Sequence, residues 1–516
     1  MSSVLSRQPG IHDERLKIGL LLLFMLVITR LGWLSDDAFI SFRTVRNFVE
    51  GYGLTWNPVE RVQAYTHPLW LFLVAVAYAC TREIFLTSIL LSIALTSLAV
   101  ARVLYRLTAS IAQALAFIAM LLCSQAVLDY SSSGLESPLS YLLAAGFCVA
   151  WLQSTAGQRP IFRLFFLGGL LALNRLDLTL LVAPALAVAL FQQRSGKTIR
   201  LAVAALLPLV LWEIFSLVYY GFPFPNTYYA KLGTGIPERE YLAQGLIYLV
   251  DILAQDPATL LIVFLAVALA AEPAVRGRQM PLALGLVFYL AYVVFAGGDF
   301  MQGRFLCVPA FIAAIMLTQR ANDARPLEWS PLPAAALIAA IAATRLFHPE
   351  GPDMPIRANG VADERRFYFD TTALIHYHRG LRVPDQHPWA IAGAKMRDDA
   401  NERVFVFGTV GFAGYAAGPA VTIVDFHALS DPFLARLSSE SPWRIGHFAR
   451  IIPPGYLESL HAGQNRFQDP KLAALYDQVV LVTRGPLFSW ARFKAIWAMN
   501  TGNPGAADQN VSQTDR

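Results

Sequence analysis

The sequence predicts a polytopic α-helical membrane protein, and three observations lead to this fold class. Hydrophobic residues make up 56% of the 516 residues and charged residues only 15%, whereas a soluble domain usually carries about 25% charged residues. The apolar residues gather in long runs that suit helices across a bilayer core of about 30 Å. Arginine and lysine concentrate in short links between alternate runs, as in the cytoplasmic loops of membrane proteins.

Eleven apolar runs are predicted to span the membrane. They lie at residues 17–34, 84–105, 107–128, 135–155, 161–174, 178–192, 200–220, 257–272, 281–297, 304–319 and 331–345. The run at 68–80 is too short to cross, and a crossing there would turn every later basic loop outward. We therefore expect it to lie along the outer membrane face, and the amphipathic segment 241–254 likewise. No small-residue cleavage site follows the first run, which predicts a retained helix with its N-terminus inside.

The predicted domains follow from this topology. Residues 1–345 form the transmembrane catalytic module, with 35–66 as the first outer loop. Residues 346–500 form an extracytoplasmic α/β domain, and the polar tail 501–516 is expected to be disordered. The protein is thus expected in the cytoplasmic (inner) membrane, with its unusual polar loops and C-terminal domain facing the periplasm or exterior.

Two patterns in the C-terminal domain predict local structure. Residues 403–425 read as strand, turn, helix and strand, and 478–486 as a further strand. The spacing Gly408-x-x-Gly411-x-x-Gly414 is a weak signal for a phosphate-binding turn, and close packing of a helix on a strand is the favoured interpretation.

The charge pattern argues against a nucleic-acid partner, and the cysteine content argues against disulfide and cysteine–metal sites. The net charge is +5, but no basic tract with interleaved aromatic residues is present, so nucleic acid is not an expected partner. The four cysteines all lie in apolar stretches, which predicts neither a disulfide framework nor a cysteine-based metal site.

Adjacent carboxylates, Asp36 and Asp37, begin the first outer loop. They could serve as an N-cap pair for a helix beginning near Ala38, but one acid would satisfy that need. A carboxylate partly desolvated at the membrane edge suits a general base toward an acceptor hydroxyl. Arg43 and Arg46 are expected near these acids or near lipid phosphates.

Three further outer segments carry polar residues that each have more than one interpretation. His67, which precedes Pro68, is a metal ligand, a hydrogen-bond anchor or only a turn-stabilising residue. Glu136 caps the next helix or lines the same cavity as the acids. Arg175 forms an ion pair with Asp177 at a helix turn, or holds a phosphate.

The remaining candidates come from two loops rich in proline or glycine. Residues 221–233, which two prolines stiffen, carry Asn226, Tyr228 and Lys231. Lys231 offers a cation close to lipid headgroups, but its position is also explained if it only extends its ammonium group to the membrane surface. Residues 297–305 place Asp299 and Arg304 among glycines that allow close backbone approach.

Together these residues suit sugar transfer from a polyprenyl phosphate. Such a donor has a good leaving group, so the site needs a base for the incoming hydroxyl and positive charge for the departing phosphate. The base is expected in the acidic pair, and the phosphate-binding charges are Arg175, Lys231 and Arg304. The cavity is expected to be lined by His67, Glu136, Asn226, Tyr228 and Asp299. A direct attack would invert the anomeric carbon.

The string "DDAFISFRTVRNFVEGYGLTWNPVERVQAYTHPLW" (36–70) resembles the terminal β-(1→2)-arabinofuranosyltransferases of actinobacterial cell walls. It also resembles their relatives that add arabinofuranose to type IV pilins, all within the GT-C glycosyltransferase fold. The strings "PNTYYAK", "GGDFMQGRF", "DFHALSDPFLAR" and "WRIGHFARIIPPGY" extend the resemblance to about residue 456. "NRLD" (174–177) departs from the Arg-Pro-acid string expected in such relatives, which leaves the backbone at Arg175 in doubt.

The resemblance implies a GT-C-like module, a decaprenyl-phosphate arabinofuranose donor and a carboxylate base in the Asp36–Asp37 pair, without deciding which acid it is. A glycan or pilin-like acceptor is implied, and arabinan, lipoglycan, pilin and O-antigen all stay open. Several GT-C enzymes use a divalent metal near the acidic pair. A metal therefore stays an alternative, although Arg and Lys alone can also neutralise a phosphate.

Three other functions compete with this one. The same fold can use another polyprenyl-phosphate sugar, such as mannose or an aminoarabinose. A lipid flippase or transporter would place charged residues inside the spans, whereas here the ionisable residues cluster at the outer ends, with Glu213 a partial exception. A structural scaffold leaves the acids and cations unexplained. In the C-terminal domain, Trp389, Trp443 and His447 are candidate sugar contacts, with packing the favoured role for each.

Overall fold

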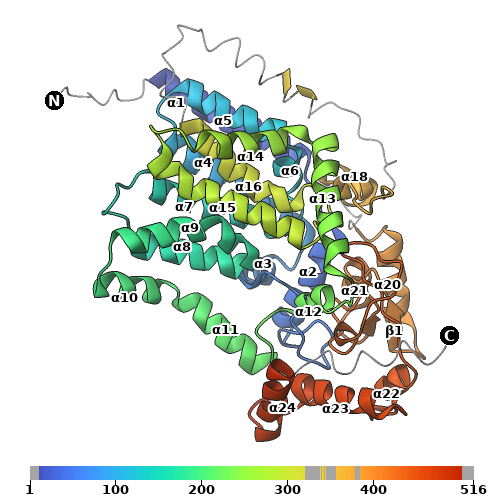
Figure 1. The fold of residues 1–516 in the computed structure, drawn as a ribbon. Helices are drawn as coiled ribbons and strands as arrows, with labels where there is room; N and C mark the ends of the chain where they lie inside the picture. Colours follow the sequence, from blue (N-terminus) through green and yellow to red (C-terminus); the bar gives the residue numbers. More distant parts are fainter. Residues whose placement is uncertain are drawn as a thin grey trace. The chain divides into compact units, whose positions relative to one another are not determined.

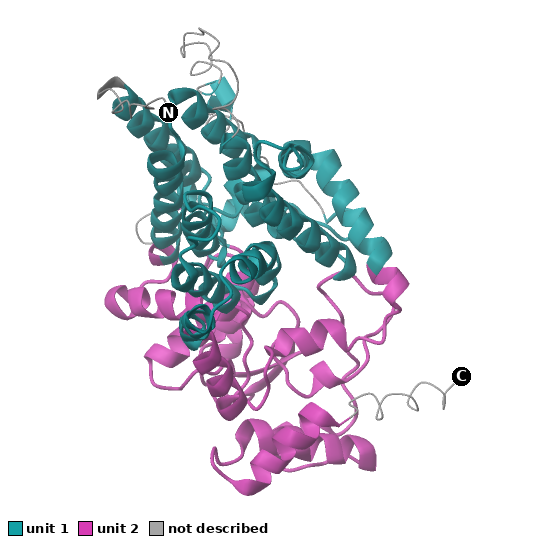
Figure 2. Ribbon diagram, turned by 60° about the vertical axis from the view of Figure 1, so that its left-hand side comes forward, with its two compact units in different colours: residues 1–34, 88–207, 242–376 teal, residues 35–87, 208–241, 377–516 magenta. Residues whose placement is uncertain are grey.

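The computed structural model describes residues 11–319, 356–377 and 384–502, with a few isolated positions between 338 and 344. The chain divides into two compact units, each built from three separate stretches of sequence (Figures 1 and 2). Unit 1 comprises residues 1–34, 88–207 and 242–376, and unit 2 comprises 35–87, 208–241 and 377–516. This division follows contacts within the chain; the predicted domain boundary at residue 345 lies outside the described residues and stays a prediction.

Unit 1 is helical throughout its described residues. Its helices are α1 (Ile11–Arg30), α4 (Phe85–Leu107), α5 (Ile111–Cys123), α6 (Gln125–Asp129), α7 (Ser137–Leu152), α8 (Ile161–Asn174), η1 (Leu176–Leu178), α9 (Thr179–Gln192), α10 (Gly196–Ala205), α13 (Glu238–Gln255), α14 (Pro257–Leu269), α15 (Arg276–Phe295), η2 (Arg304–Leu306), α16 (Cys307–Thr318), α18 (Glu364–Phe367), α19 (Phe369–Thr372) and η4 (Leu374–His376). α4 and α13 each begin with a few residues of unit 2.

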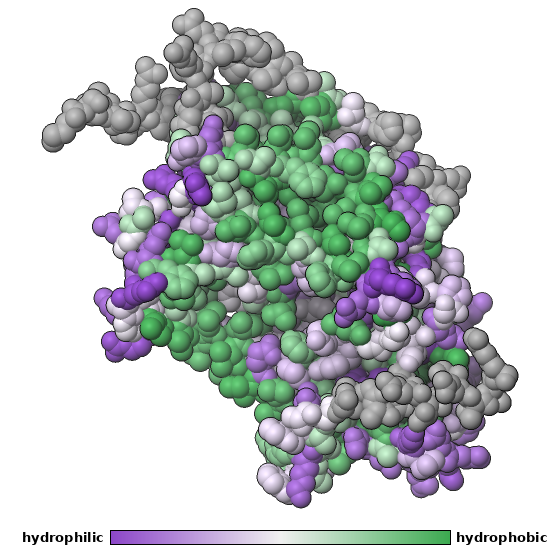
Figure 3. Space-filling model, viewed as in Figure 1, coloured by the Kyte–Doolittle hydropathy of each residue, from purple (hydrophilic) through white to green (hydrophobic). Residues whose placement is uncertain are grey.

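The apolar runs become helices as predicted, but the number of membrane crossings is not confirmed. Among the described residues, α4 and α15 alone are long and apolar enough to cross a membrane, or up to four spans if each of two bent pairs counts as one. Shorter apolar helices occupy most of the other predicted spans, and the predicted span 331–345 falls largely outside the described residues. Hydrophobic side chains cover a broad surface over α14 and α15, including Phe264 and Phe288, which are each about half exposed (Figure 3).

Two predicted spans are broken in the structure. The run 107–128 forms α5 and α6, because Ser124 adopts an extended conformation and caps α6 with its hydroxyl. The run 200–220 forms α10 and α11 (Leu207–Tyr219), which meet at an angle of 50°. Pro208 lies at this bend, where its missing N–H and its ring prevent a straight helix.

Segment 241–254 is helical as predicted, within α13. α13 and α14 meet at 109° around Asp256, whose side chain caps α14 by accepting a hydrogen bond from the Thr259 N–H. The two helices therefore do not form one straight span. The placement of α13 at a membrane face stays a prediction.

Unit 2 combines helices with a small parallel sheet. Its elements are α2 (Asp36–Val49), α3 (Pro68–Thr81), most of α11, α12 (Asn226–Leu232), α20 (Pro388–Asp398), β1 (Val404–Phe407), α21 (Phe412–Ala417), β2 (Thr422–Asp425), η5 (Leu434–Arg436), α22 (Tyr456–Ala462), α23 (Pro470–Arg484) and α24 (Trp490–Thr501). β1 and β2 pair in parallel, with Val404 opposite Thr422 and Phe407 opposite Asp425. The predicted order of strand, helix and strand is confirmed.

The strand predicted at 478–486 is wrong, because this segment belongs to α23. Asp469 accepts a hydrogen bond from the Lys471 N–H, and Pro470 occupies the first helical position, two features that begin a helix. Tyr476, Val479 and Val482 are buried at intervals of three residues, which a helix places on one face. A short β-branched run cannot be distinguished from a buried helical segment by its composition alone.

Helices in unit 1 approach closely at glycines. A Cβ at Gly285 of α15 would lie 2.0 Å from the Leu181 carbonyl oxygen of α9, and one at Gly245 of α13 would lie 2.2 Å from the Val294 carbonyl oxygen. Small residues at helix crossings allow this kind of backbone contact in membrane proteins. The close packing of α9, α13 and α15 therefore depends on glycine at positions 245 and 285, because any side chain there would collide with the neighbouring backbone.

Gly285→Ala is expected to lower the free energy of unfolding by about 1–3 kcal/mol, because the added methyl group forces α9 and α15 apart. The measurement is the thermal unfolding of purified protein in detergent. Gly277→Ala in the same helix is the matched control, since a Cβ there meets nothing within 4 Å. Equal melting temperatures for the two variants would contradict this packing.

Candidate active site

The acidic pair begins α2 in unit 2. Ser35 caps the helix by accepting a hydrogen bond from the Ala38 N–H at 3.3 Å. Asp36 and Asp37 therefore occupy the first turn, and the expectation that they are the N-cap residues is wrong. Their negative charges still suit the positive end of the helix dipole.

Asp36 is buried and held by the backbone of another segment. Its Oδ1 accepts a hydrogen bond from the Phe412 N–H at 2.7 Å, and its Oδ2 from the Gly411 N–H at 3.1 Å. Burial raises the pKa of Asp36 to about 7, with the Asp37 charge raising it further and the two backbone N–H groups opposing the change. Both carboxylate oxygens are thus committed to fixing α2 against the start of α21.

Asp37 and His67 differ in their surroundings. Asp37 is half-buried, whereas Asp36 is 7% exposed. His67 is buried at the N-cap position of α3, and its Nε2 lies 2.8 Å from the Ser41 Oγ of α2. Its role as a hydrogen-bond anchor between α2 and α3 is therefore present in the structure.

Arg43 is also an anchor. Its guanidinium is fully buried and donates to the carbonyl oxygens of Trp56, Gly414 and Val421 at 2.7–2.8 Å, while it stacks 4.2 Å from the centre of the Trp56 ring. The expectation that Arg43 faces lipid phosphates is wrong, because three backbone carbonyls of unit 2 occupy its N–H groups. Arg43 and Asp36 together bind one helix to the segment 411–421.

The three spaced glycines allow this close approach. A Cβ at Gly411 would lie 1.9 Å from the Asp36 carbonyl oxygen, one at Gly414 would lie 2.7 Å from the Trp56 ring, and one at Gly408 would lie 2.3 Å from the Phe426 ring. The glycines therefore serve close packing, but against α2, Trp56 and Phe426 rather than of a helix on a strand.

The 221–233 loop separates into structural and exposed residues. Asn226 donates to the carbonyl oxygens of Ala428, Leu429 and Asp431 and accepts a hydrogen bond from Arg436 Nη1 at 2.9 Å, so its amide is occupied by protein. Tyr228 is 42% exposed, with its ring stacked on Phe224.

Lys231 lies in the last turn of α12 and is half-buried. No carboxylate lies within salt-bridge distance of its ammonium among the described residues. Its charge and that of Arg444 contribute to lowering the pKa of His447 to about 3, although burial is the larger cause. His447 packs edge-on against His427, so Lys231 faces a pair of imidazoles.

Trp443 is engaged by neighbouring groups. Its Nε1–H donates to Glu240 Oε2 at 3.0 Å, and its ring stacks on Tyr241. Trp389 lies against His387. These contacts show a packing role, and sugar binding by Trp389, Trp443 or His447 stays a prediction.

Unit 1 brings three other predicted residues together around Glu136. This carboxylate is buried at the N-cap position of α7, where its side chain makes no cap hydrogen bond. Its Oε1 lies 3.3 Å from Arg175 Nη1 and 3.6 Å from Arg304 Nη2. Arg304 also lies 3.8 Å from Asp299 Oδ2. Glu136 is therefore shared between two arginines from distant parts of the sequence.

The two arginines are held with different strength. Arg175 Nε donates to both oxygens of Asp177, at 2.9 and 3.1 Å, and its guanidinium lies 4.6 Å from the centre of the Phe305 ring. The contacts of Arg304 with carboxylates are longer, at 3.6 and 3.8 Å. The predicted ion pair of Arg175 with Asp177 is confirmed, and a bound phosphate would have to compete with it.

Two groups in unit 1 were missed by the sequence reasoning. The Tyr289 hydroxyl donates to Asp177 Oδ2 at 2.9 Å. Arg365 Nε donates to Asp129 Oδ1 at 2.7 Å in a buried pair, and burial raises the pKa of Asp129 to about 7 against the effect of Arg365. No local spacing signals either contact, because the partners are more than 100 residues apart.

The predicted residues thus fall into two groups. Unit 1 holds Glu136, Arg175, Asp299 and Arg304, and unit 2 holds Asp36, Asp37, His67, Asn226, Tyr228 and Lys231. Among the described residues, no group of three or more His, Cys, Asp or Glu side chains is arranged to hold a metal ion. No chemical step is therefore assigned to a metal here.

Glu136→Gln is expected to lower the free energy of unfolding by about 3–5 kcal/mol, because it leaves the buried Arg175 and the partly buried Arg304 without their shared charge. Thermal unfolding in detergent measures the effect. The exposed Glu272→Gln of the same unit is the control and should melt like the wild type. A Glu136→Gln variant as stable as the control would show that the pairs carry no net stability.

Asp36 should make stability depend on pH. Between its ordinary pKa of 3.8 and its folded pKa of about 7, the folded protein holds a proton that the unfolded chain has released. Stability due to this group therefore falls as pH rises through this window, by up to about 1.4 kcal/mol per pH unit. Burial also raises the pKa of Asp129 and of Asp431 to about 7, so these two groups change the stability of this protein in the same direction.

Melting curves of the wild type and of Asp36→Asn between pH 5 and 7.5 measure how much Asp36 contributes to the pH dependence of stability. The wild type should lose stability more steeply with rising pH than the variant. The exposed Asp370→Asn serves as control and should follow the wild type. Parallel curves for wild type and Asp36→Asn would contradict a raised pKa at this position.

Comparison with known proteins confirms the expected resemblance. No family model matches the sequence. The chain is 28% identical over 520 residues to the terminal β-(1→2)-arabinofuranosyltransferase of Mycobacterium tuberculosis, covering 82% of this chain and 81% of that protein. It is 28% identical over 398 residues to the protein of the same name from Corynebacterium glutamicum, covering 68% of this chain and 57% of that one.

A comparison of structures finds ArnT from Cupriavidus metallidurans, solved with undecaprenyl phosphate bound. The sequence identity is 12% and the TM-score 0.44, over 80% of this chain and 85% of that one. The sequence comparison is the stronger finding. The chain is similar to a terminal β-(1→2)-arabinofuranosyltransferase over about four fifths of its length.

Proposed function

We propose that this chain is a membrane glycosyltransferase that transfers arabinofuranose from decaprenyl phosphate to a glycan or glycoprotein acceptor at the extracytoplasmic face. The observation that carries the proposal is the similarity to a terminal β-(1→2)-arabinofuranosyltransferase over 82% of the chain. Apolar helices with broad hydrophobic surfaces support a membrane location. Polyprenyl-phosphate mannose or aminoarabinose is the alternative donor within the same reaction class.

Within this proposal, Asp37 is the general base and Asp36 positions it. The two oxygens of Asp36 are occupied by the N–H groups of Gly411 and Phe412, and the side chain is buried. Its pKa of about 7 would suit a base, but an acceptor hydroxyl would have to reach oxygens that already fix the backbone. Asp37, half-buried in the same helical turn, leaves an acceptor more room.

The cations proposed to bind the donor phosphate differ in the ion pairs that they make with carboxylates of the protein. Lys231 has no carboxylate within salt-bridge distance among the described residues. Arg304 is held by longer ion pairs than Arg175, which is bound bidentately by Asp177. Arg304 in unit 1 and Lys231 in unit 2 are each proposed as a candidate cation for the leaving phosphate, and Arg175 is proposed to hold Glu136 in place. His67 is proposed to fix α2 through Ser41.

The reaction is proposed as a single displacement. Asp37 accepts the proton of the acceptor hydroxyl as its oxygen attacks the anomeric carbon, and the bond to the phosphate oxygen breaks with its electron pair. Such a step inverts the anomeric configuration. Retention in the product would instead require a two-step reaction through a covalent intermediate.

Transfer assays with two aspartate variants test the proposed roles. Purified protein is incubated with radiolabelled decaprenyl-phosphate arabinofuranose and a panel of arabinan and pilin acceptors. Asp37→Asn should stay folded and lose about 10²–10⁴-fold in rate, the usual contribution of a general base. Asp36→Asn should also lower thermal stability, because it disrupts the contact with Gly411 and Phe412.

The reverse pattern would overturn the assignment. A stable Asp36→Asn without activity, beside an active Asp37→Asn, would make Asp36 the base. Asp370→Asn again serves as the control for handling and should transfer at the wild-type rate.

A further inference from the structure

A basic cavity lies in unit 1, away from the charged cluster around Glu136. It has a volume of about 780 Å³ and lies where the N-terminus of α8, the C-terminus of α9 and the N-terminus of α10 meet. Its lining includes Arg159, Arg163, Arg194 and Lys197 and contains no acidic residue. The volume falls within the range of small-ligand sites.

The local sequence leaves these charges without compensation. Between Glu136 and Glu213 the sequence contains a single acidic residue, Asp177. Arg159 is buried and engaged by the wall, since its Nη1 donates to the Trp151 carbonyl at 2.6 Å and its guanidinium stacks on the Trp151 ring. The other three cations are exposed.

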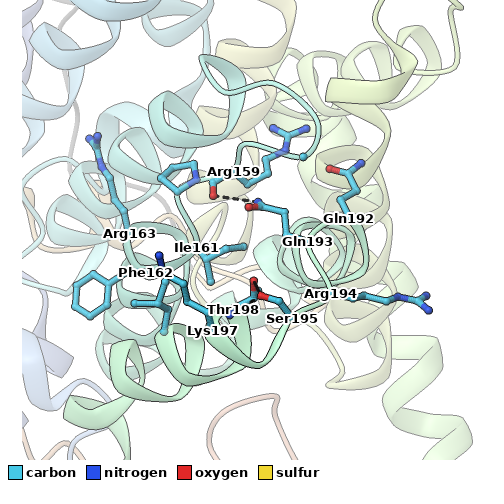
Figure 4. Close-up of a pocket in the computed structure, with 13 residues that line it drawn as sticks. Arg159, Ile161, Phe162, Arg163, Gln192, Gln193, Arg194, Ser195, Lys197 and Thr198 are labelled. Atoms are coloured by element: carbon cyan, nitrogen blue, oxygen red, sulfur yellow. Dashed lines mark hydrogen bonds between the residues drawn. The ribbon is translucent and has the colours of Figure 1, made fainter.

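Hydrogen bonds fix the segments that form the walls of the cavity. Gln193 Nε2 donates to the Arg159 carbonyl oxygen at 3.0 Å, which ties the end of α9 to the start of α8 (Figure 4). Ser195 caps α10 by accepting a hydrogen bond from the Thr198 N–H. Figure 4 shows Lys197 extending from α10 toward Phe162, with Arg163 and Arg194 on opposite sides. These long side chains can reach an anion from three directions.

The rim of the cavity is apolar. Phe162 and Leu201, which line the cavity beside the three exposed cations, are 47% and 37% exposed. Exposed aromatic and aliphatic side chains beside lysine and arginine are typical of the membrane interface, where the apolar parts meet acyl chains and the charges meet headgroups. A free phosphate ion would make no favourable contact with this apolar rim.

We propose that this cavity binds the phosphate of an anionic phospholipid headgroup. The arrangement matches basic pockets between transmembrane helices that bind anionic headgroups. Arg163, Arg194 and Lys197 supply the charge, Phe162 and Leu201 contact the acyl chains, and Arg159 shapes the wall. The bound lipid would join α8, α9 and α10 just before the bend between α10 and α11. This site is independent of the proposed sugar transfer.

Lipid binding to full-length protein in nonionic detergent tests the proposal. The probes are phosphatidylglycerol, phosphatidylcholine, glycerol 1-phosphate and inorganic phosphate, and the readouts are lipid retained in native mass spectrometry and the shift in melting temperature. The wild type should retain phosphatidylglycerol in preference to phosphatidylcholine. Arg163→Gln/Lys197→Gln should weaken this binding about 30-fold, or about fivefold for each charge removed.

Arg106→Gln/Arg276→Gln is the matched control, with the same loss of charge at exposed positions of the same unit that do not line the cavity. This control should bind phosphatidylglycerol as the wild type does. A second cavity variant, Arg194→Gln/Lys197→Gln, should show the same weakened binding and replaces the first double variant if that one folds poorly. Equal binding by wild type and both cavity variants would overturn the proposal. Stabilisation by inorganic phosphate or glycerol 1-phosphate equal to that by phosphatidylglycerol would overturn the lipid as the ligand.

Discussion

The buried contact of Asp36 with the backbone of Gly411 and Phe412 is the constraint on which the rest of unit 2 depends. A buried carboxylate is costly unless its oxygens are satisfied, and here two N–H groups satisfy them. Arg43 adds three hydrogen bonds from the same helix to the carbonyls of Trp56, Gly414 and Val421. Because α2 is fixed in this way, the backbone at the neighbouring Asp37 is fixed as well. Asp36 therefore anchors the helix, and Asp37 is the residue proposed as the base.

Unit 1 contains two charged groups with opposite electrostatic characters. Around Glu136, two arginines meet three carboxylates, Glu136, Asp177 and Asp299, so the carboxylates outnumber the cations. Around Lys197, four cations line a cavity with no acid. The desolvation cost of a buried ion pair is offset only by good geometry, and the bidentate pair of Arg175 with Asp177 has it. The first group therefore ties segments of unit 1 together, with Arg304 as its proposed phosphate ligand, and the second group is proposed to bind the phosphate of a lipid.

Sequence reasoning located most helices, because apolar runs of this length have few other structures available. It also anticipated the pair of Arg175 with Asp177, two residues apart, and the order of strand, helix and strand in unit 2. It could not pair Asp36 with Gly411, since 375 residues separate them, nor identify Asn226 as an anchor rather than a cavity residue. The strand expected at 478–486 failed because a β-branched run next to a capping Asp469 and Pro470 forms a helix. The number of membrane crossings and the extracytoplasmic placement stay predictions.

The central claim is that this relative of arabinofuranosyltransferases uses a polyprenyl-phosphate pentose, and a competition between donors tests it most directly. Wild-type protein would receive decaprenyl-phosphate arabinofuranose and decaprenyl-phosphate mannose, each with its own radiolabel, in one reaction with arabinan, lipoglycan and pilin acceptors. The account predicts that the arabinofuranose label alone enters product. Entry of the mannose label alone would keep the reaction class and contradict the donor, and failure of both labels to enter any acceptor would contradict sugar transfer itself.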